Sequence, residues 1–173
     1  TYVEDFAVDL VLGKRTRHQQ GLAQAGLRGS LVVLQAQTTR ATAALAKALQ
    51  VPARSPLLAL RVRGDAEGQP LHISERYFPL PRFENLVAVV RETGSITAGF
   101  TAHGVADYTR RESRITAELP SAEVAAQLRQ PTSRPVLQVE SLNVDLAGTP
   151  IEWARAWFAG DRVKLTIDHD EHI

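Results

Sequence analysis

The pattern of apolar and polar positions occurs twice along this chain. A first copy spans Thr42–Phe78 and a second copy spans Ser121–Phe158. The two copies begin 79 positions apart, and the same spacing separates Pro52 from Pro131. This self-similarity predicts that the chain is built from two copies of one structural unit.

Each copy has the residue order of a helix followed by a β-hairpin. A Thr or Ser N-cap opens a short amphipathic segment, and a proline-bearing loop ends it. A β-rich run, a polar turn with Gly68 or Gly148, and a second β-rich run follow. One more strand is predicted ahead of each helix, at Ser30–Thr38 and at Asp107–Leu119.

Two units of strand, helix and hairpin predict the α+β class. The expected architecture is an antiparallel sheet with the helices packed on one face. A last strand at Arg162–Ile167 is expected to extend the second hairpin. Three helical segments are predicted outside the repeats, at Thr16–Ala25, Pro81–Arg91 and Ser95–Thr101. Because no low-complexity linker interrupts the pattern, residues 1–173 are predicted to form a single domain.

Composition narrows the classes of protein to which the chain can belong. Hydrophobic residues make up 44% and charged residues 23%, the balance of an ordinary globular domain. No apolar run is long enough to cross a bilayer and no signal-peptide pattern is present, so we expect a cytoplasmic protein without membrane contact. Without cysteine, the chain can form neither a disulfide nor a thiolate metal site.

The charge balance argues against nucleic-acid binding by these residues. Lys and Arg number 20 against 19 Asp and Glu, a formal net charge of +1, whereas a domain that binds phosphates carries a basic excess. The chain also begins at Thr1 and contains no methionine. We therefore expect a further segment upstream of these residues.

A first candidate site for an anion is the basic segment Arg15, Thr16 and Arg17. It lies at the predicted start of a helix, where unpaired amides and the helix dipole attract negative charge. Thr16 can serve as N-cap, and the two arginines add donors for a phosphate, phosphonate or carboxylate. A solvated basic helix start, which is common, is the alternative.

A second candidate is the pair Arg61 and Arg63 in a predicted strand. Two positions apart, they point to the same face of the sheet, which they share with Leu57 and Ala59. A mixture of cationic and apolar side chains suits the wall of a pocket. An exposed strand with cross-strand salt bridges is the competing interpretation.

A third candidate is Glu152, in the last strand of the second repeat. Strand alternation places it on one face with Ala154, Ala156 and Phe158. These neighbours predict that Glu152 is partly buried, and a buried carboxylate needs a partner. A structural arginine is the safer expectation, and a ligand hydroxyl or amine is the alternative.

Signatures of catalysis are missing from the sequence. It contains no nucleophile elbow, no Gly-rich phosphate loop and no His-Glu-x-x-His motif. The ligand-like tail His169–His172 has nothing to fix a metal geometry, so a polar chain end explains it better. We therefore expect no catalytic residue, no metal and no cofactor.

The order of motifs nevertheless resembles a known family. The segment 151–155 (IEWAR) followed by 160–162 (GDR), and preceded by 114–117 (RITA), is similar to the UTRA domain. The resemblance covers about Tyr2 to Ile167. It implies a chorismate-lyase-like fold and the effector-binding half of a GntR-type transcription regulator of the HutC branch. The PhnF-type regulators of phosphonate use are the most similar, on 15–17 (RTR), 107–110 (DYTR) and 143–145 (NVD).

The resemblance also implies partners and a ligand. Such regulators are homodimers, and this one would be a repressor that meets DNA only through a winged helix-turn-helix domain absent from this chain. The implied effector is a small anionic metabolite of phosphate or phosphonate type. An enzyme on the same fold, a chorismate-lyase-like protein, is the alternative.

Site residues follow from the resemblance by matching position. They are Arg15, Thr16, Arg17, Arg61, Arg63, Ser74, Ser95, Tyr108, Glu152 and Phe158. In two places the chain departs from sugar-phosphate sensors, because Ser74 stands where those relatives often have Glu and Phe158 where they often have Tyr. Both departures remove polar contacts to a sugar, which argues against an amino-sugar phosphate.

Overall fold

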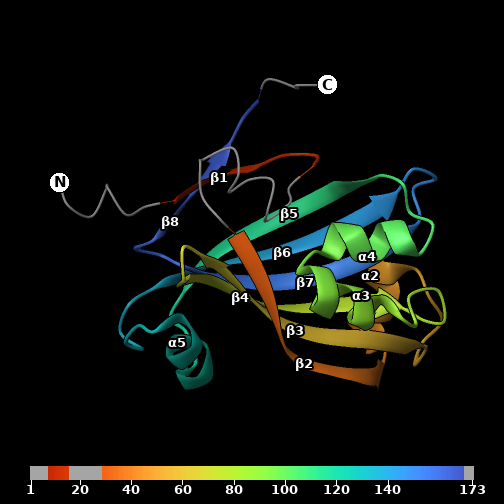
Figure 1. The fold of residues 1–173 in the computed structure, drawn as a ribbon, viewed down its shortest axis with the longest axis horizontal. Coiled ribbons are helices and arrows are strands. Elements are labelled where there is room, and N and C mark those ends of the chain that lie inside the picture. Colours follow the sequence, from red (N-terminus) through yellow and green to blue (C-terminus); the bar gives the residue numbers. More distant parts are fainter. Residues whose placement is uncertain (1–7, 16–28, 170–173) are drawn as a thin grey trace.

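The computed structural model describes residues 8–15 and 29–169, and its centre is a six-stranded antiparallel sheet (Figure 1). The strands run in the order β2 (Gly29–Arg40), β3 (Pro56–Ala66), β4 (Gln69–Pro79), β7 (Pro150–Ala159), β6 (Val136–Asp145) and β5 (Tyr108–Glu118). Four helices of the described residues accompany the sheet: α2 (Ala43–Leu49), α3 (Leu86–Thr93), α4 (Ile96–Ala102) and α5 (Ala122–Leu128). The α+β class and the antiparallel sheet are confirmed.

The duplication in the sequence is visible in the sheet. The order β2-β3-β4 is mirrored by β5-β6-β7, and β4 pairs with β7 at the centre. The caps of the equivalent helices have nearly the same geometry. Thr42 caps α2 with φ −67° and ψ 166°, and Ser121 caps α5 with φ −64° and ψ 162°. Both helices end at a left-handed residue with φ 55°, Gln50 and Arg129.

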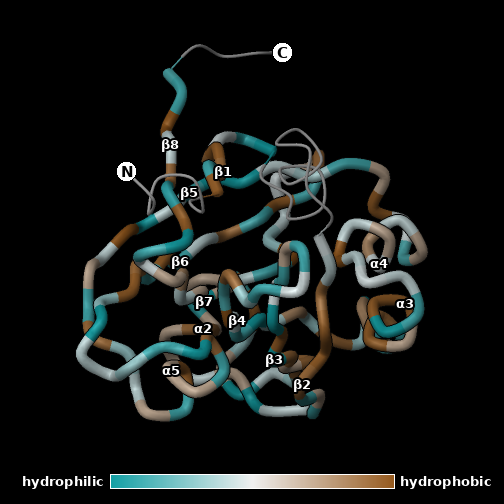
Figure 2. The backbone as a smooth tube through the Cα atoms, turned by 60° about the vertical axis from the view of Figure 1, so that its left-hand side comes forward, coloured by the Kyte–Doolittle hydropathy of each residue, from teal (hydrophilic) through white to brown (hydrophobic). Residues whose placement is uncertain are grey.

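The helices do not lie on one face, and here the sequence-based expectation is wrong. Leu58 and Leu60 pack with α3 and α4, whereas their neighbour Leu57 packs with α2 on the opposite side. Successive side chains of a strand point to opposite faces, so β3 is covered on both. Figure 2 shows α2 and α5 to one side of the sheet and α3 and α4 to the other. The continuous apolar run of β3 is typical of a strand buried on two faces.

The two repeats are interlocked by their helices. Helix α2 packs against β7 of the second repeat, and α5 packs against β4 of the first. Val124 and Leu128 of α5, for example, join a core cluster with Ile73 of β4. Neither repeat can therefore bury its helix fully without the other.

Two further predictions need correction. The helix predicted from Pro81 begins only at Leu86, because the intervening residues form turns. The strand predicted at Arg162–Ile167 exists as β8 (Val163–Ile167), but it pairs in parallel with β1 (Val8–Leu12) and does not extend the second hairpin. The sequence pattern was not interpreted as a strand at β1, although its apolar and polar residues alternate. The helix predicted at Thr16–Ala25 lies outside the described residues.

The turn between β6 and β7 is organised by Asp145. Its carboxylate accepts hydrogen bonds from the amides of Ala147 (3.0 Å) and Thr149 (2.9 Å) and from the guanidinium of Arg82 (3.0 Å). Burial by itself raises the pKa of Asp145, but these donors together outweigh burial, and the pKa is lowered. Gly148 closes the turn with φ +82°, a conformation that favours glycine.

Candidate functional site

A buried polar cluster lies on the sheet face that α3 and α4 cover. We call it the Glu152 cluster, and it consists of Ser74, Arg76, Asn143 and Glu152. Glu152 is only 1% exposed. Its carboxylate accepts from Arg76 Nη1 at 2.8 Å and from Asn143 Nδ2 at 2.6 Å. Arg76 Nε also donates to Ser74 Oγ at 3.0 Å. The predicted burial of Glu152 is confirmed, and its partner is a structural arginine.

The strand pairing explains why these four residues meet. Asn143 of β6 lies directly opposite Glu152 of β7. Arg76 lies opposite Ala154, and Ser74 lies opposite Ala156. The small side chains of β7 leave room beside them for the long side chain of Arg76. Arg76 is therefore held by both its own strand and the neighbouring one.

The small side chains continue across the sheet as a low floor beside the cluster. Ser74, Ser141, Ala154 and Ala156 are all buried and share this face. None of these side chains rises far above the backbone. The floor is bounded at one end by the ion pair of Arg76 and Glu152.

The first residues of β5 and the start of α4 bring further polar groups to the same side of the sheet. The Arg110 guanidinium approaches Asn143 Oδ1 at 3.5 Å. Tyr108 is buried against Phe100, and its hydroxyl lies 2.6 Å from Thr97 Oγ1. Ser95 accepts from the Ala98 amide as N-cap of α4. Tyr108 thus lies on the same sheet face as the Glu152 cluster, and Ser95 opens α4, a helix that packs on that face.

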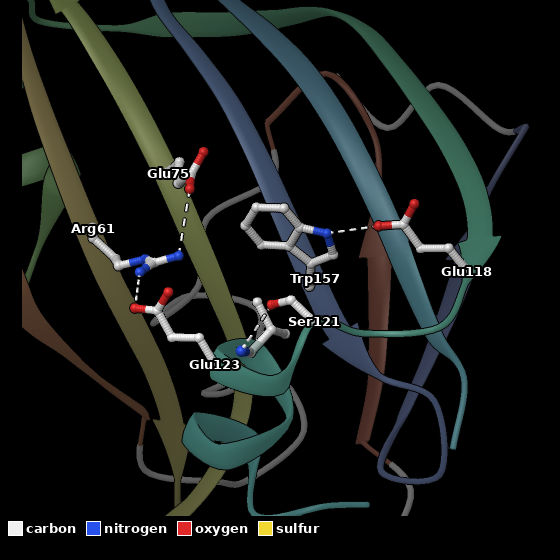
Figure 3. Close-up of polar contacts among 7 residues, drawn as sticks. Arg61, Glu75, Glu118, Ser121, Glu123 and Trp157 are labelled. Atoms are coloured by element: carbon white, nitrogen blue, oxygen red, sulfur yellow. Dashed lines mark hydrogen bonds and ion pairs between the residues drawn. The ribbon is translucent and has the colours of Figure 1, made fainter. Parts of the chain in front are cut away.

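Arg61 and Arg63 lie on the other face of the sheet. Arg61 sits between Glu75 of β4, at 3.4 Å, and Glu123 of α5 (Figure 3). Arg63 pairs with Asp65 at 2.8 Å, and the hydrogen bond that it donates to this carboxylate raises the pKa of the guanidinium. Arg61 therefore forms a cross-strand salt bridge, which was the competing interpretation of its sequence pattern. Its role in ligand binding stays a prediction.

Charges of alternating sign cross this second face from strand to strand. Arg61 lies opposite Glu75, Glu75 opposite Arg155, and Arg155 opposite Glu140. Arg155 also donates to Glu140 at 3.1 Å. One row along, the Trp157 indole donates to Glu118 at 2.8 Å (Figure 3). Each arginine on this row has a carboxylate neighbour, so the row compensates its own charge.

The remaining predicted site residues are dispersed. Arg15 pairs with Asp107, just before β5, at 2.6 Å, and the hydrogen bond to this carboxylate raises the pKa of Arg15. Phe158 stacks at 5.0 Å against the ring of buried His72. Thr16 and Arg17 lie outside the described residues. The structure therefore brings Ser74 and Glu152 into one cluster, places Tyr108 and Ser95 on the same side of the sheet, and leaves Arg61 and Arg63 on the other face.

Sequence reasoning missed Arg76 and Asn143, although a signal for one of them was present. Arg76 is two positions from Ser74, so strand alternation already places both on one face. Asn143 could not be found in this way, because it meets Glu152 only through the register of β6 with β7. That register depends on tertiary pairing.

Metal binding and a membrane-spanning helix are two further possibilities for the residues described. No group of three or more His, Asp or Glu side chains in ranges 8–15 and 29–169 is arranged to hold a metal ion. Within the same ranges, no helix is both long and apolar enough to span a membrane.

Comparison with known proteins agrees with this architecture. Residues 24–164 match the model of the UTRA domain. A helix-turn-helix-type transcriptional regulator of Rhizobium meliloti is 35% identical over 161 residues, which cover 93% of this chain and 66% of that regulator. The chain thus spans slightly less than two thirds of the length of this relative.

Solved structures share the fold. PhnF from Mycobacterium smegmatis superposes with a TM-score of 0.86 at 22% identity, covering 96% of this chain and 73% of that one. The separate effector domain of the same PhnF gives a TM-score of 0.83 at 21% identity, covering 95% of this chain and all (100%) of the other. The predicted chorismate-lyase-like fold is confirmed. The match of residues 24–164 to the family model, together with the 35% identical relative, shows that the chain belongs to the UTRA domain family.

Proposed function

We propose that this chain is the effector-sensing domain of a bacterial GntR-type transcription regulator, a cytoplasmic repressor of the HutC branch. Family membership and the regulator from Rhizobium meliloti support this proposal. In it, the chain forms a homodimer, and DNA is bound by a winged helix-turn-helix domain outside these residues. The near-neutral charge of the chain is consistent with DNA binding by residues outside it.

The proposed effector is a small phosphate- or phosphonate-type anion that binds beside the Glu152 cluster. One observation carries this assignment. Arg76 is fixed by Glu152 and Ser74, while its Nη2 makes no hydrogen bond to the described residues. Arginine presents a planar fork that suits phosphate and carboxylate oxygens. A preoriented fork with a free donor, next to a floor of small side chains, is suited to hold a small anion.

The charge of this face also favours an anion. Arg110 lies beside the cluster, 3.5 Å from Asn143 Oδ1, and its guanidinium adds positive charge to the side of the sheet on which the proposed ligand would bind. Arg61 and Arg63 are not part of the proposed site, because one small ligand cannot contact both faces of a sheet.

Isothermal titration calorimetry with methylphosphonate and with inorganic phosphate tests the site. Arg76→Gln retains a polar side chain near Glu152 but loses the charge and the free donor, and we expect it to weaken binding at least tenfold. Arg134→Gln, which changes an exposed arginine in the loop between α5 and β6, is the matched control and should bind as the parent does.

The outcomes separate the parts of the proposal. Unchanged affinity in Arg76→Gln would show that the anion binds elsewhere. Absence of binding for both anions would reject the ligand class. Formation of 4-hydroxybenzoate on incubation with chorismate would instead favour an enzyme on the same fold.

A further inference from the structure

The second face of the sheet, opposite the Glu152 cluster, carries a hollow beside α2. Helix α2 packs on Leu57 and Tyr77 of this face. Next to them, a space of about 110 Å³ opens over β2, β3 and β4. We call it the Ala59 pocket, and its lining side chains are those of Gln35, Gln37, Ala59, Arg61, Glu75 and Tyr77. One water molecule needs only about 10–15 Å³ of such space, so the pocket can hold a small molecule.

The register of three strands explains why this space exists. Gln37 lies opposite Ala59 and Ala59 opposite Tyr77, so the row has a small side chain at its centre. The adjacent row of the same face consists of Gln35, Arg61 and Glu75. Two positions before Ala59 along β3, the larger side chain of Leu57 is covered completely, with 0% exposure. The pocket is therefore the part of this face that lies beyond the cover of α2.

Several polar groups of the pocket have no partner among the described residues. Arg61 Nε is buried and makes no hydrogen bond there. The side chains of Gln35 and Gln37 are exposed and make no hydrogen bond within the same part of the chain. Burial, and after it the charge of Glu75, raises the pKa of Tyr77, so its hydroxyl stays protonated and can donate. The pocket thus offers donors and acceptors at close spacing.

The charges around the pocket favour a neutral ligand. Arg61 already lies between Glu75, at 3.4 Å, and Glu123 of α5 (Figure 3). An anion at this place would meet two carboxylates, and a cation would meet the guanidinium of Arg61. Neither sign of charge is therefore favoured, in contrast to the anion proposed beside the Glu152 cluster.

We propose that the Ala59 pocket binds a neutral polyhydroxyl compound, namely a single sugar ring or a polyol. A hydroxyl group both donates and accepts, as the carboxamides of the pocket also do. Neighbouring hydroxyls can therefore pair with the two glutamines and with Arg61 Nε. The C–H groups between the hydroxyls can pack on Ala59 and on the ring of Tyr77, which has an apolar face and a polar end.

This site is separate from the proposed effector site. Successive side chains of β4 point to opposite faces, so Glu75 and Tyr77 point away from Ser74 and Arg76. The Ala59 pocket and the Glu152 cluster thus lie back to back on one strand. The inference goes beyond the proposed function, because it adds a second ligand of different charge on the other face.

NMR spectroscopy of the chain with D-glucose, D-ribose and glycerol tests the pocket. We expect saturation transfer from the protein to at least one of the three compounds. The same compound should shift the side-chain amide signals of Gln35 and Gln37, which lie on the wall of the pocket.

Ala59→Leu is the decisive variant, because it fills the space and keeps every polar group. We expect it to weaken binding of the compound at least tenfold. Ala53→Leu, which changes an exposed alanine in the loop between α2 and β3, is the matched control and should bind as the parent does. Tyr77→Phe removes only the hydroxyl and should weaken binding roughly fivefold, the effect of one net hydrogen bond.

A second variant covers the case in which Ala59→Leu does not fold, which circular dichroism melting would reveal. Gln37→Leu changes an exposed residue of the edge strand β2 and removes one carboxamide without filling the space. It should also weaken binding roughly fivefold and leave the melting temperature nearly unchanged.

The possible results decide the proposal. If none of the three compounds binds, the polyhydroxyl class is wrong. Equal affinity in the parent, Ala59→Leu and Gln37→Leu would place the compound elsewhere on the domain. Shifts of the glutamine amides by methylphosphonate or tetramethylammonium, but by none of the three compounds, would show that the pocket takes a charged ligand. Calorimetry with methylphosphonate tests the effector site on the other face, so either proposal can fail alone.

Discussion

Replacing Arg76 by methionine tests how much the buried ion pair contributes to stability. The change keeps an unbranched side chain as far as the position of Nε but leaves the Glu152 carboxylate, 1% exposed, without its cationic partner. Removing one member of a buried pair costs about 3–5 kcal/mol, because the other charge stays buried. Asn143 retains its hydrogen bond to Glu152, so the lower end of this range, about 3 kcal/mol, is expected.

The expected loss is large enough to measure in two ways. A domain of this size changes its melting temperature by about 2–4 °C per kcal/mol, so Arg76→Met should melt roughly 6–12 °C lower. Urea unfolding, followed by the fluorescence of the two tryptophans, gives the free energy directly. Arg76→Met/Glu152→Gln removes the uncompensated charge and should recover most of the loss.

A surface pair provides the comparison. Arg134 and Asp161 are 3.1 Å apart, with side chains 44% and 36% exposed, and such pairs contribute about 0–1 kcal/mol. Arg134→Met should therefore change little. Our reasoning fails if Arg76→Met costs no more than Arg134→Met, or if the double variant loses the sum of both single changes.

Three further predictions concern the fold. Gly64→Ala places a Cβ 2.1 Å from the ring of buried His72 and should destabilise the domain by about 1–3 kcal/mol in urea unfolding. Thr42→Ala and Ser121→Ala should each cost about 1 kcal/mol by calorimetric melting, and by similar amounts, because the two N-caps share one geometry. The pKa of Asp145 is lowered in the folded state, so its stabilising contribution is complete above the unfolded pKa of about 3.9 and is lost as pH falls through the folded pKa. The stability difference between the parent and Asp145→Asn should accordingly shrink in acid denaturation curves.

Each of these predictions has a control or a contrary outcome. Gly13→Ala meets no atom within 4 Å and should be neutral, so equal losses at positions 13 and 64 would contradict the steric argument. A large difference between the two cap variants would mean that the repeats are not energetically equivalent. A constant gap between the parent and Asp145→Asn from neutral to acid pH would contradict the hydrogen bonds assigned to that carboxylate.

The sequence by itself determined the units of this fold. The spacing of N-caps, prolines and turn glycines is local chemistry, and it located both repeats, both hairpins and the helix capped by Ser95. Alternation along one strand also sufficed to predict that Glu152 is buried. These features need only the residues within a few positions along the chain.

Tertiary structure decided how the units combine. The sequence pattern shows apolar residues on both faces of β3. Only the packing shows that α2 covers one face and that α3 and α4 cover the other. For the same reason Arg61 and Glu152, which resemblance placed in one site, lie on opposite faces of the sheet. The partners of Glu152 come from two other strands, and their register is set by long-range pairing. Local sequence carries the direction of a side chain relative to its own strand, whereas its neighbours depend on which strands lie beside it.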